Sequence, residues 1–464
     1  MKSPTLHKRS AALALAVALA LGGCALKAPP GPDELRAQAL PNLQPPPAWK
    51  AASAAAGAVQ AGWVASFGDP QLPKLIDEAL QYNADLAVAA ARVEQAGATV
   101  RVAGGQIYPA VNLAARSSKD GGGGSDPLTG WFVNASWELD VWGRVRYGVR
   151  AAEDQYASAQ ADTEYARQSL AALVTKAWLL AIEARQQGKL AAESVAAGER
   201  LVTMAEQRLR IGVGSESEVV QARASLETLR DSKAQIELAY AQALRALEVL
   251  LGRYPAAEIE VAAEFPAMPG PVPAGLPSEL LERRPDVVAA ERRVAAAFDL
   301  VGEAKAARLP RISLTAGVNN ISSDMVVLQN RDNPAWGFGA GLLMPIFQGG
   351  ALQAQVELRT AQQKEAVAAY AQVGLRAFNE VENALSSEFT ARDRQAILER
   401  ATAENQRALT LEETRYKVGS SDMRAVTQQN LALYASQMSL LRVRSEQRVQ
   451  RVNAYLALGG GFGS

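Results

Sequence analysis

The sequence predicts an α+β membrane protein built from two structural repeats, in which barrel-type β-strands are continued by very long helices. Three observations lead to this class. The two halves of the chain align with each other, each half carries two runs with the alternation of a β-strand, and each half carries a long stretch without proline.

The N-terminus is organised like a secretory signal. Three basic residues lie within the first nine positions, an apolar run follows over residues 11–21, and the only cysteine, Cys24, comes after two glycines. The apolar run has 11 residues, whereas a helix that spans a bilayer needs about 20. We therefore expect residues 1–23 to be a signal peptide and the Pro- and Ala-rich residues 24–70 to be an extended tether.

Removal of residues 1–23 narrows the chemistry that is open to the remaining chain. It takes away His7, the only histidine, and leaves 45 Lys and Arg against 48 Asp and Glu. Because the remaining chain has no imidazole and has Cys24 as its only thiol, most hydrolase and metalloenzyme designs are excluded. The near-neutral charge, without a basic block, also argues against nucleic acid as a partner. The sequence thus predicts a protein that is not an enzyme and that uses no cofactor or metal.

The repeat is visible as matching segments. Residues 208–212 (RLRIG) match residues 415–419 (RYKVG) at an offset of 207, and Arg92 and Val93 match Arg293 and Val294 at an offset of 201. Each repeat has the same plan: a helix introduced by Leu-Pro, two strands, a long helix, a glycine-containing turn and a returning helix.

The repeat plan sets the predicted domain boundaries. The first repeat covers residues 71–251 and the second covers residues 277–458. A linker rich in Pro and Gly joins them over residues 252–276, and residues 459–464 are expected to be a disordered tail.

Four strands are predicted from their period-2 alternation, over residues 111–118, 131–142, 311–322 and 335–347. In the second of them the apolar side chains fall on alternate positions: Trp131, Val133, Ala135, Trp137 and Leu139. A transmembrane strand needs about 9–11 residues with one apolar and one polar face. Because outer-membrane barrels begin at about eight strands, other copies of the chain must contribute, and the residues alone leave open whether there are two or three.

The helices after the strands are too long for a compact domain. Residues 144–210 contain no proline, and a helix of this length extends on the order of 100 Å. The returning helices carry apolar residues at the 4-3-4 spacing of antiparallel coiled coils: Ile236, Tyr240, Ala243, Leu247 and Leu250 in one, and Thr427, Leu431, Tyr434, Met438 and Leu441 in the other. The turns between the helices are expected at residues 211–215 and 418–422.

Seven segments, in order along the chain, resemble the TolC-type outer-membrane efflux proteins, in the lipoprotein branch that serves multidrug pumps. They are residues 63–72 (WVASFGDPQL), 83–96 (NADLAVAAARVEQA), 136–144 (SWELDVWGR), 275–290 (GLPSELLERRPDVVAA), 344–350 (MPIFQGG), 378–385 (FNEVENAL) and 415–419 (RYKVG). The resemblance implies a homotrimer with a 12-stranded barrel in the outer membrane and a 12-helix tunnel in the periplasm. It also implies a passive exit duct for drugs or toxic compounds, served by a periplasmic adaptor and an inner-membrane pump of the resistance-nodulation-division class.

The segment Leu-Gly-Gly-Cys, residues 21–24, resembles the lipobox of bacterial lipoproteins. This resemblance implies cleavage before Cys24 and acylation of that residue, as by palmitate. Ala25, where an Asp would favour the inner membrane, implies delivery to the outer membrane, so that the lipid of that membrane is a further partner.

In the family the two glycine turns lie at the periplasmic tips, where the tunnel closes and the adaptor binds. The resemblance therefore assigns gate or adaptor-contact roles to residues around both turns, in which charge pairs are expected to hold the closed state. They are Arg208, Arg210, Gly212, Val213, Glu216 and Glu218 at the first turn, and Arg415, Tyr416, Lys417, Gly419, Ser420, Asp422, Arg424 and Gln428 at the second.

The second turn departs from the family pattern. Relatives often carry an acid nine residues after the glycine, whereas this chain has Gln428 there, with Arg424 nearby. We therefore expect an aperture that is less selective for cations. Two other functions stay open: a duct for type I protein secretion, and a lipid-anchored periplasmic coiled-coil scaffold.

Overall fold

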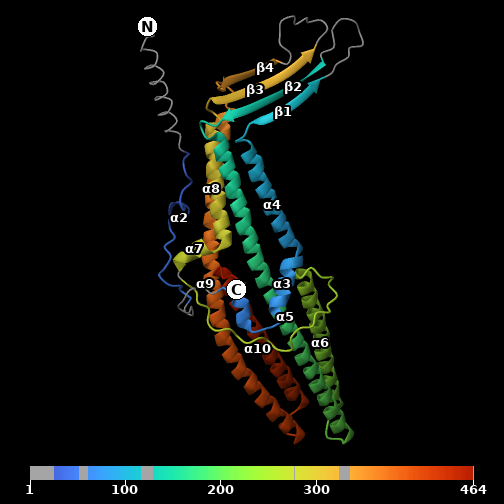
Figure 1. The fold of residues 1–464 in the computed structure, drawn as a ribbon. Coiled ribbons are helices and arrows are strands. Elements are labelled where there is room, and N and C mark those ends of the chain that lie inside the picture. Colours follow the sequence, from blue (N-terminus) through green and yellow to red (C-terminus); the bar gives the residue numbers. More distant parts are fainter. Residues whose placement is uncertain (1–25, 52–60, 117–128, 276, 323–334, 463–464) are drawn as a thin grey trace, which may run out of the picture. The chain divides into compact units, whose positions relative to one another are not determined.

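The computed structural model describes residues 26–51, 61–116, 129–275, 277–322 and 335–462. Its helices and strands are shown in Figure 1. Residue contacts divide the chain into two compact units. The sheet unit comprises Met1–Leu43, Ala91–Ala161 and Val288–Val373, and the helical unit comprises Gln44–Ala90, Asp162–Val287 and Gly374–Ser464.

The predicted repeat is present in the lengths of the helices. Helices α4 (Ala84–Gly105) and α8 (Pro285–Ala306) both have 22 residues. The long helices α5 (Arg144–Arg210) and α9 (Ala351–Lys417) both have 67 residues, and the returning helices α6 (Glu216–Leu250) and α10 (Met423–Ala457) both have 35. None of the helices in the described ranges combines the length and apolar character needed to cross a membrane.

The sheet unit carries one antiparallel sheet in the order β1-β2-β3-β4. Its strands are β1 (Ala110–Arg116), β2 (Thr129–Leu139), β3 (Arg311–Ser322) and β4 (Ala335–Leu343). The predicted β3 matches in full. In contrast, β2 begins two residues earlier than predicted and ends three residues earlier, and β4 ends four residues earlier. Pro345 lies among residues 344–347, which were predicted to be strand but lie beyond the end of β4. A proline has no N–H to donate to a neighbouring strand, which explains the earlier end.

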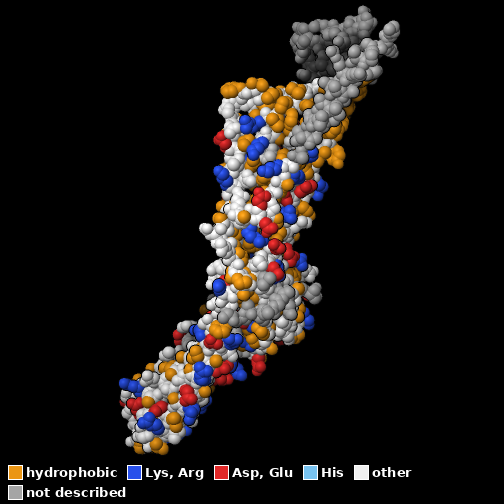
Figure 2. All heavy atoms as spheres, turned by 90° about the vertical axis from the view of Figure 1, so that its left-hand side faces the viewer, with side chains coloured by type: hydrophobic (Ala, Val, Ile, Leu, Met, Phe, Trp, Pro, Cys, Tyr) orange, Lys and Arg blue, Asp and Glu red, His pale blue; other side chains and the backbone are white. Residues whose placement is uncertain are grey.

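The strand register joins the apolar residues of neighbouring strands into one face. Phe338 pairs with Ala316, Ala316 pairs with Ala135, and Ala135 pairs with Val111. On the opposite face lie the neighbouring residues of each strand: Asn112, Ser136, Thr315 and Gly339. Figure 2 shows apolar side chains gathered over the strands, whereas charged side chains are spread over the helices.

The end of β2 is tied to the start of α5 by two carboxylates. Arg144 donates two hydrogen bonds to Glu138, both 2.9 Å, and the backbone N–H groups of Val145 and Arg146 donate to Asp140 at 3.1 and 3.0 Å. The carboxylate of Asp140 thus occupies the position where a helix leaves its first N–H groups without partners. These residues explain why the segment SWELDVWGR has its particular composition.

The helical unit contains a buried arginine, Arg284, which is 1% exposed. Its guanidinium donates to Asp286 at 3.0 and 2.8 Å, pairs with Glu380 at 2.8 Å, and donates to the carbonyl of Ala457 at 3.0 Å. A buried guanidinium needs such partners to offset its lost hydration. The contact joins the start of α8, the middle of α9 and the end of α10.

The tether and the tail are more structured than predicted. The tether contains helix α2 (Pro32–Ala39) and a 3-10 helix, η1 (Trp63–Phe67), so it is not simply extended. Trp63 stacks on Tyr455 with ring centroids 5.5 Å apart. The expectation of a disordered tail is wrong for residues 459–462, because the N–H of Gly62 donates to the carbonyl of Gly461 at 2.8 Å.

The second repeat also begins differently from the first. In the first repeat, Leu-Pro opens helix α3 (Leu72–Tyr82). In the second, Pro277 opens a 3-10 helix, η2 (Pro277–Glu279), which is followed by the single turn α7 (Leu280–Arg283).

Candidate gate at the helical tips

The first tip joins α5 to α6. Gly212 has a φ of 77°, a conformation that glycine adopts without strain. The N–H groups of Val213 and Gly214 then both donate to the carbonyl of Arg208 at 3.0 Å. Ser215 and Glu218 form a capping box, in which each side chain accepts a hydrogen bond from the backbone N–H of the other. The turn is therefore rigidly defined on both sides.

The second tip joins α9 to α10 in a similar way. Gly419 has a φ of 79°, and the N–H of Ser420 donates to the carbonyl of Arg415 at 2.8 Å. Asp422 caps α10 by accepting from the N–H of Ala425 at 2.9 Å.

Glu412 accepts two side-chain hydrogen bonds within the second tip. It accepts from the hydroxyl of Ser421 at 2.7 Å and from Arg415 at 2.8 Å. The hydrogen bond from Ser421, together with Arg415, lowers the pKa of the Glu412 carboxyl below its ordinary value.

Arg208 and Tyr416 make one of the contacts between the two hairpins, and it lies next to the tips. Arg208 of the first hairpin donates to the carbonyl of Tyr416 in the second at 2.8 Å, and its guanidinium lies 4.4 Å from the centroid of the Tyr416 ring. Tyr416 is 0% exposed. A cation over an aromatic ring contributes about 0.5–2 kcal/mol, with the larger values where water is excluded. The contact thus combines a hydrogen bond with a cation–π interaction between the two hairpins.

An apolar cluster surrounds that contact. Its buried members come from all four helices: Leu201, Ala205, Val219, Ala222, Leu409, Tyr416, Met423, Val426 and Leu433. Met423 and Val426 are as completely buried as Tyr416. The hairpins therefore share one core near their tips, and separating them would expose this apolar surface to water.

Within the described residues, the packing between the hairpins leaves two polar atoms without hydrogen-bond partners. The hydroxyl of Tyr416 and the Nε of Arg208 are buried and make no hydrogen bond. Burial, with a smaller contribution from Glu218, raises the pKa of Tyr416, while Arg208 opposes that effect. An unpaired buried polar group costs about 1–3 kcal/mol. These two groups therefore offset part of the stability that the surrounding apolar packing provides.

The other predicted site residues do not meet across the hairpins. Glu218 and Asp422 serve their own helix ends, and Arg415 pairs with Glu412 of its own helix. The rest are exposed: Arg210, Gly212, Val213, Glu216, Lys417, Gly419, Ser420, Arg424 and Gln428. The expected latch of charge pairs is absent from the part of the chain that is described here, because none of its ion pairs near the tips joins one hairpin to the other.

Sequence reasoning missed several residues that shape the tips. The capping box at residues 215–218 has a recognisable Ser-x-x-Glu pattern and was therefore detectable. The roles of Glu412, Ser421 and the buried Met423 had no comparable signal. Within the described ranges, no group of three or more His, Cys, Asp or Glu side chains is placed to hold a metal ion.

Comparisons with known proteins agree with this architecture. The family model described as outer membrane efflux protein matches residues 75–253 and 276–460. The chain is 32% identical to the cation efflux system protein CusC of Escherichia coli O6:H1, over 97% of this chain and 98% of that protein. It is also 32% identical to the antibiotic efflux pump outer membrane protein ArpC of Pseudomonas putida, over 97% of this chain and 95% of that protein.

Among solved structures, the outer-membrane channel OprN matches with a TM-score of 0.80 and 27% identity, covering 91% of this chain and 99% of the other. The two matched blocks of the family model coincide with the two repeats. Four strands and long helices per chain are also the composition of the trimeric channels of known structure. The predicted fold class is thereby confirmed. The chain belongs to the outer membrane efflux protein family, and it is a non-enzymatic, TolC-like channel of an efflux pump, located in the outer membrane with its helical part in the periplasm.

Proposed function

We propose that the chain is the exit duct of a tripartite pump for small toxic organic compounds, and that the packed hairpin tips form its closed gate. The proposed gate rests on one observation, the contact of Arg208 with Tyr416 inside a core that both hairpins share. The similarity to ArpC, which is named for antibiotic efflux, supports the class of substrate. The duct performs no chemistry, so the energy for export comes from an inner-membrane pump of the resistance-nodulation-division class.

The exposed apolar side chains of the two turns form the surface that meets a periplasmic adaptor. Ile211, Val213 and Val418 are 71%, 60% and 75% exposed. Apolar residues at the tip of a polar hairpin are typical of a binding surface, because burying them against a partner releases free energy of about 25 cal/mol per Å². This gain is available only when the adaptor binds, and it can be coupled to the separation of the hairpins.

The proposed gate can be tested by comparing substitutions at two nearby arginines, Arg208 and Arg210. Arg208→Ala removes the contact with Tyr416, whereas Arg210→Ala changes an exposed arginine without a partner in the described residues. In planar bilayers, we expect Arg208→Ala to raise the open probability of the purified channel severalfold and Arg210→Ala to leave it near the wild-type value. Equal behaviour of the two variants would exclude a gating role for the Arg208 contact.

The partner is tested by photo-crosslinking in cells from Val213 and Ser420, followed by mass spectrometry. Capture of an adaptor from a drug pump is the expected result. Capture of an adaptor from a protein secretion system would instead assign the duct to type I secretion. Capture of envelope structural proteins alone would favour a coiled-coil scaffold.

The ion selectivity of the aperture follows from its exposed charges. Gln428 is neutral, and Arg424 and Lys417 are exposed cations near the second turn. We expect weak cation selectivity, measured as a reversal potential close to zero under a KCl gradient. The variant Gln428→Glu should shift the reversal potential toward that of potassium, because it introduces a carboxylate at the same position. Strong cation preference in the wild-type channel would contradict this expectation.

Acylation of Cys24 would complete the attachment to the membrane. Cys24 and residues 1–23 lie outside the described residues. Three residues after Cys24, the N–H of Lys27 donates to the hydroxyl of Tyr147 on α5 at 2.9 Å. This hydrogen bond holds the beginning of the tether beside the first turns of α5, close in sequence to the end of β2. Labelling with a palmitate analogue should mark the wild-type protein and fail with Cys24→Ser.

A further inference from the structure

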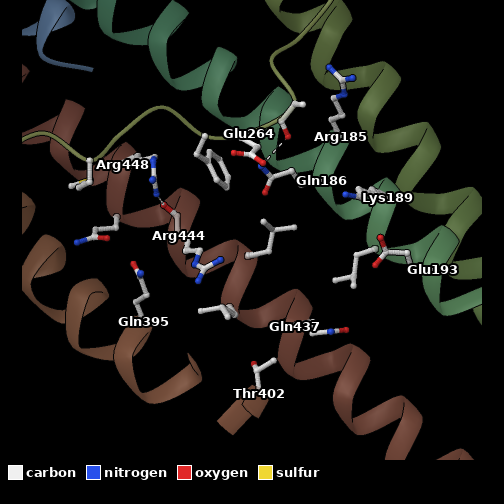
Figure 3. A pocket seen from close by; sticks show the side chains of 17 residues that line it. Arg185, Gln186, Lys189, Glu193, Glu264, Gln395, Thr402, Gln437, Arg444 and Arg448 are labelled. Atoms are coloured by element: carbon white, nitrogen blue, oxygen red, sulfur yellow. Dashed lines mark hydrogen bonds between the residues drawn. The ribbon is translucent and has the colours of Figure 1, made fainter. Parts of the chain in front are cut away.

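A cavity of about 930 Å³ lies in the helical unit, between α5, α9, α10 and the linker that joins the two repeats (Figure 3). Its volume lies within the range of sites for small ligands, about 300–1,000 Å³. None of the gate residues lines it. The cavity therefore requires an explanation of its own.

Four cationic side chains line the cavity, and three of them have no acidic partner among the described residues. Arg444 is paired with Glu399 at 2.9 Å. Arg448, by contrast, donates only to backbone carbonyls, those of Pro266 at 3.0 Å and of Arg444 itself at 2.7 Å. Arg185 donates to the carbonyl of Val261, and Lys189 is exposed without a hydrogen bond or ion pair in the described part of the chain. Figure 3 shows Arg185 and Lys189 on α5, with Arg444 and Arg448 across the cavity on α10.

The positive charge of Arg448 is poorly compensated. Burial, reinforced by the neighbouring charge of Arg444, lowers the pKa of Arg448 to about 10. A bound anion would reverse both effects, because it supplies the opposite charge that the protein omits. The guanidinium also lies 4.8 Å from the centroid of the Phe265 ring, which holds it in place at the cavity wall.

The lining contains one polar atom that is buried without a hydrogen-bond partner in the described residues, the hydroxyl oxygen of Thr402. The side chain of Gln447, which is 8% exposed, also borders the cavity. Because buried polar groups are almost always paired, the unpaired hydroxyl of Thr402 favours a polar ligand in the cavity.

The remaining lining restricts the kind of ligand. Leu190, Phe265, Met268 and Leu440 offer apolar surface beside the cations. Two carboxylates, Glu193 and Glu264, also border the cavity and would repel a ligand with several negative charges. We propose that this cavity is a binding site for an amphiphilic monoanion, a carboxylate attached to a hydrocarbon or aromatic body, with Arg448 and Lys189 at its charged end.

The proposal is tested with 11-(dansylamino)undecanoic acid, a fluorescent fatty carboxylate, added to the purified full-length trimer in detergent. We expect saturable binding of one probe per chain. Lys189→Gln should weaken it about fivefold, because Lys189 is exposed and its charge is screened by water. Arg448→Gln should weaken it more than tenfold, because the buried guanidinium would lose charge-assisted hydrogen bonds to the carboxylate. Arg200→Gln is the matched control, because Arg200 is an exposed cation of α5 that does not line the cavity.

Three results would overturn the proposal. The first is equal binding of the uncharged amide of the probe, which would show adsorption to apolar surface. The second is unchanged affinity in Lys189→Gln, an exposed position whose substitution leaves the fold intact even if Arg448→Gln does not assemble. The third is stronger displacement of the probe by dodecyl phosphate than by dodecanoate, which would contradict selection for a monoanion.

Discussion

At the scale of single residues, Asp299 is a buried acid from which we expect a pH-dependent contribution to stability. It lies on α8 in the sheet unit, is 0% exposed, and faces Arg150 of α5 at 3.1 Å. Both of its carboxylate oxygens lack hydrogen bonds. Burial raises its pKa to about 6, Arg150 opposes this rise, and the nearby acids Asp154 and Glu153 add to it.

This shift has a definite sign for stability. Because the pKa of Asp299 is higher in the folded chain than its ordinary value of 3.8, the folded state binds the proton more tightly. The free energy of unfolding should therefore fall as the pH rises from about 4 to about 6, by at most about 3 kcal/mol, and stay level above. Asp299→Asn should remove this component and raise the melting temperature of the purified trimer at pH 7.

The control for this prediction is Glu365→Gln, an exposed acid of α9 in the same unit. It should retain the pH dependence of the wild-type melting temperature. If Asp299→Asn also retains that dependence, the ionisation of Asp299 does not contribute to it.

At the scale of the elements, the helix ends decide where the hairpins turn. The capping box of Ser215 and Glu218 satisfies two N–H groups at the start of α6. Ser215→Ala should cost about 1 kcal/mol, the usual effect of losing a helix cap. We expect faster amide hydrogen exchange in the first turn of α6, measured by mass spectrometry, and unchanged exchange at the start of α10.

Ser217→Ala is the matched control for the cap. Ser217 lies two residues after Ser215 in the first turn of α6, is exposed, and forms no hydrogen bond in the described residues. Its exchange should resemble that of the wild-type protein. Equal acceleration in both variants would mean that loss of a serine at this tip, and not loss of the cap, loosens the turn.

Local patterns explain which elements could be predicted from the sequence. The bounds of α5 follow from the absence of proline and from the turn at Gly212, so the predicted range, residues 144–210, matches the observed one. Strand alternation located all four strands, but their ends depend on Pro345 and on the carboxylates that lead into α5. Helix α2 was missed because a Pro- and Ala-rich segment has no clear period.

The sequence predicted where the two helical turns lie, but it did not predict which residues make contact there. The two glycine turns mark the tips through a local requirement for positive φ. The contact between Arg208 and Tyr416 joins residues 208 positions apart, and no local pattern indicates that Tyr416 is buried between charged neighbours. The charges at the tips led us to expect ion pairs between the hairpins. In the structure, Arg208 instead contacts the backbone carbonyl and the aromatic ring of Tyr416.

At the scale of the whole molecule, the sheet is incomplete without other copies of the chain. Within the described residues, β1 and β4 each pair on one side only, which leaves two open edges. An open edge is not tolerated in lipid, because its N–H and C=O groups have no partners there. Three chains that join β4 of one copy to β1 of the next would close a barrel of 12 strands, as the family resemblance implies.

The register of the sheet predicts which face meets lipid. Phe338 lies near the middle of β4 on the apolar face, and Thr315 lies near the middle of β3 on the opposite face. An arginine at the bilayer midplane of a barrel costs about 2–4 kcal/mol on the lipid side, and a trimer carries three. Phe338→Arg should therefore prevent formation of the heat-stable trimer, scored on unheated gels of outer-membrane fractions. Thr315→Arg should assemble normally, because its side chain extends into water. Assembly of Phe338→Arg together with failure of Thr315→Arg would reverse the assignment of the two faces, and the barrel would then need a different path of closure.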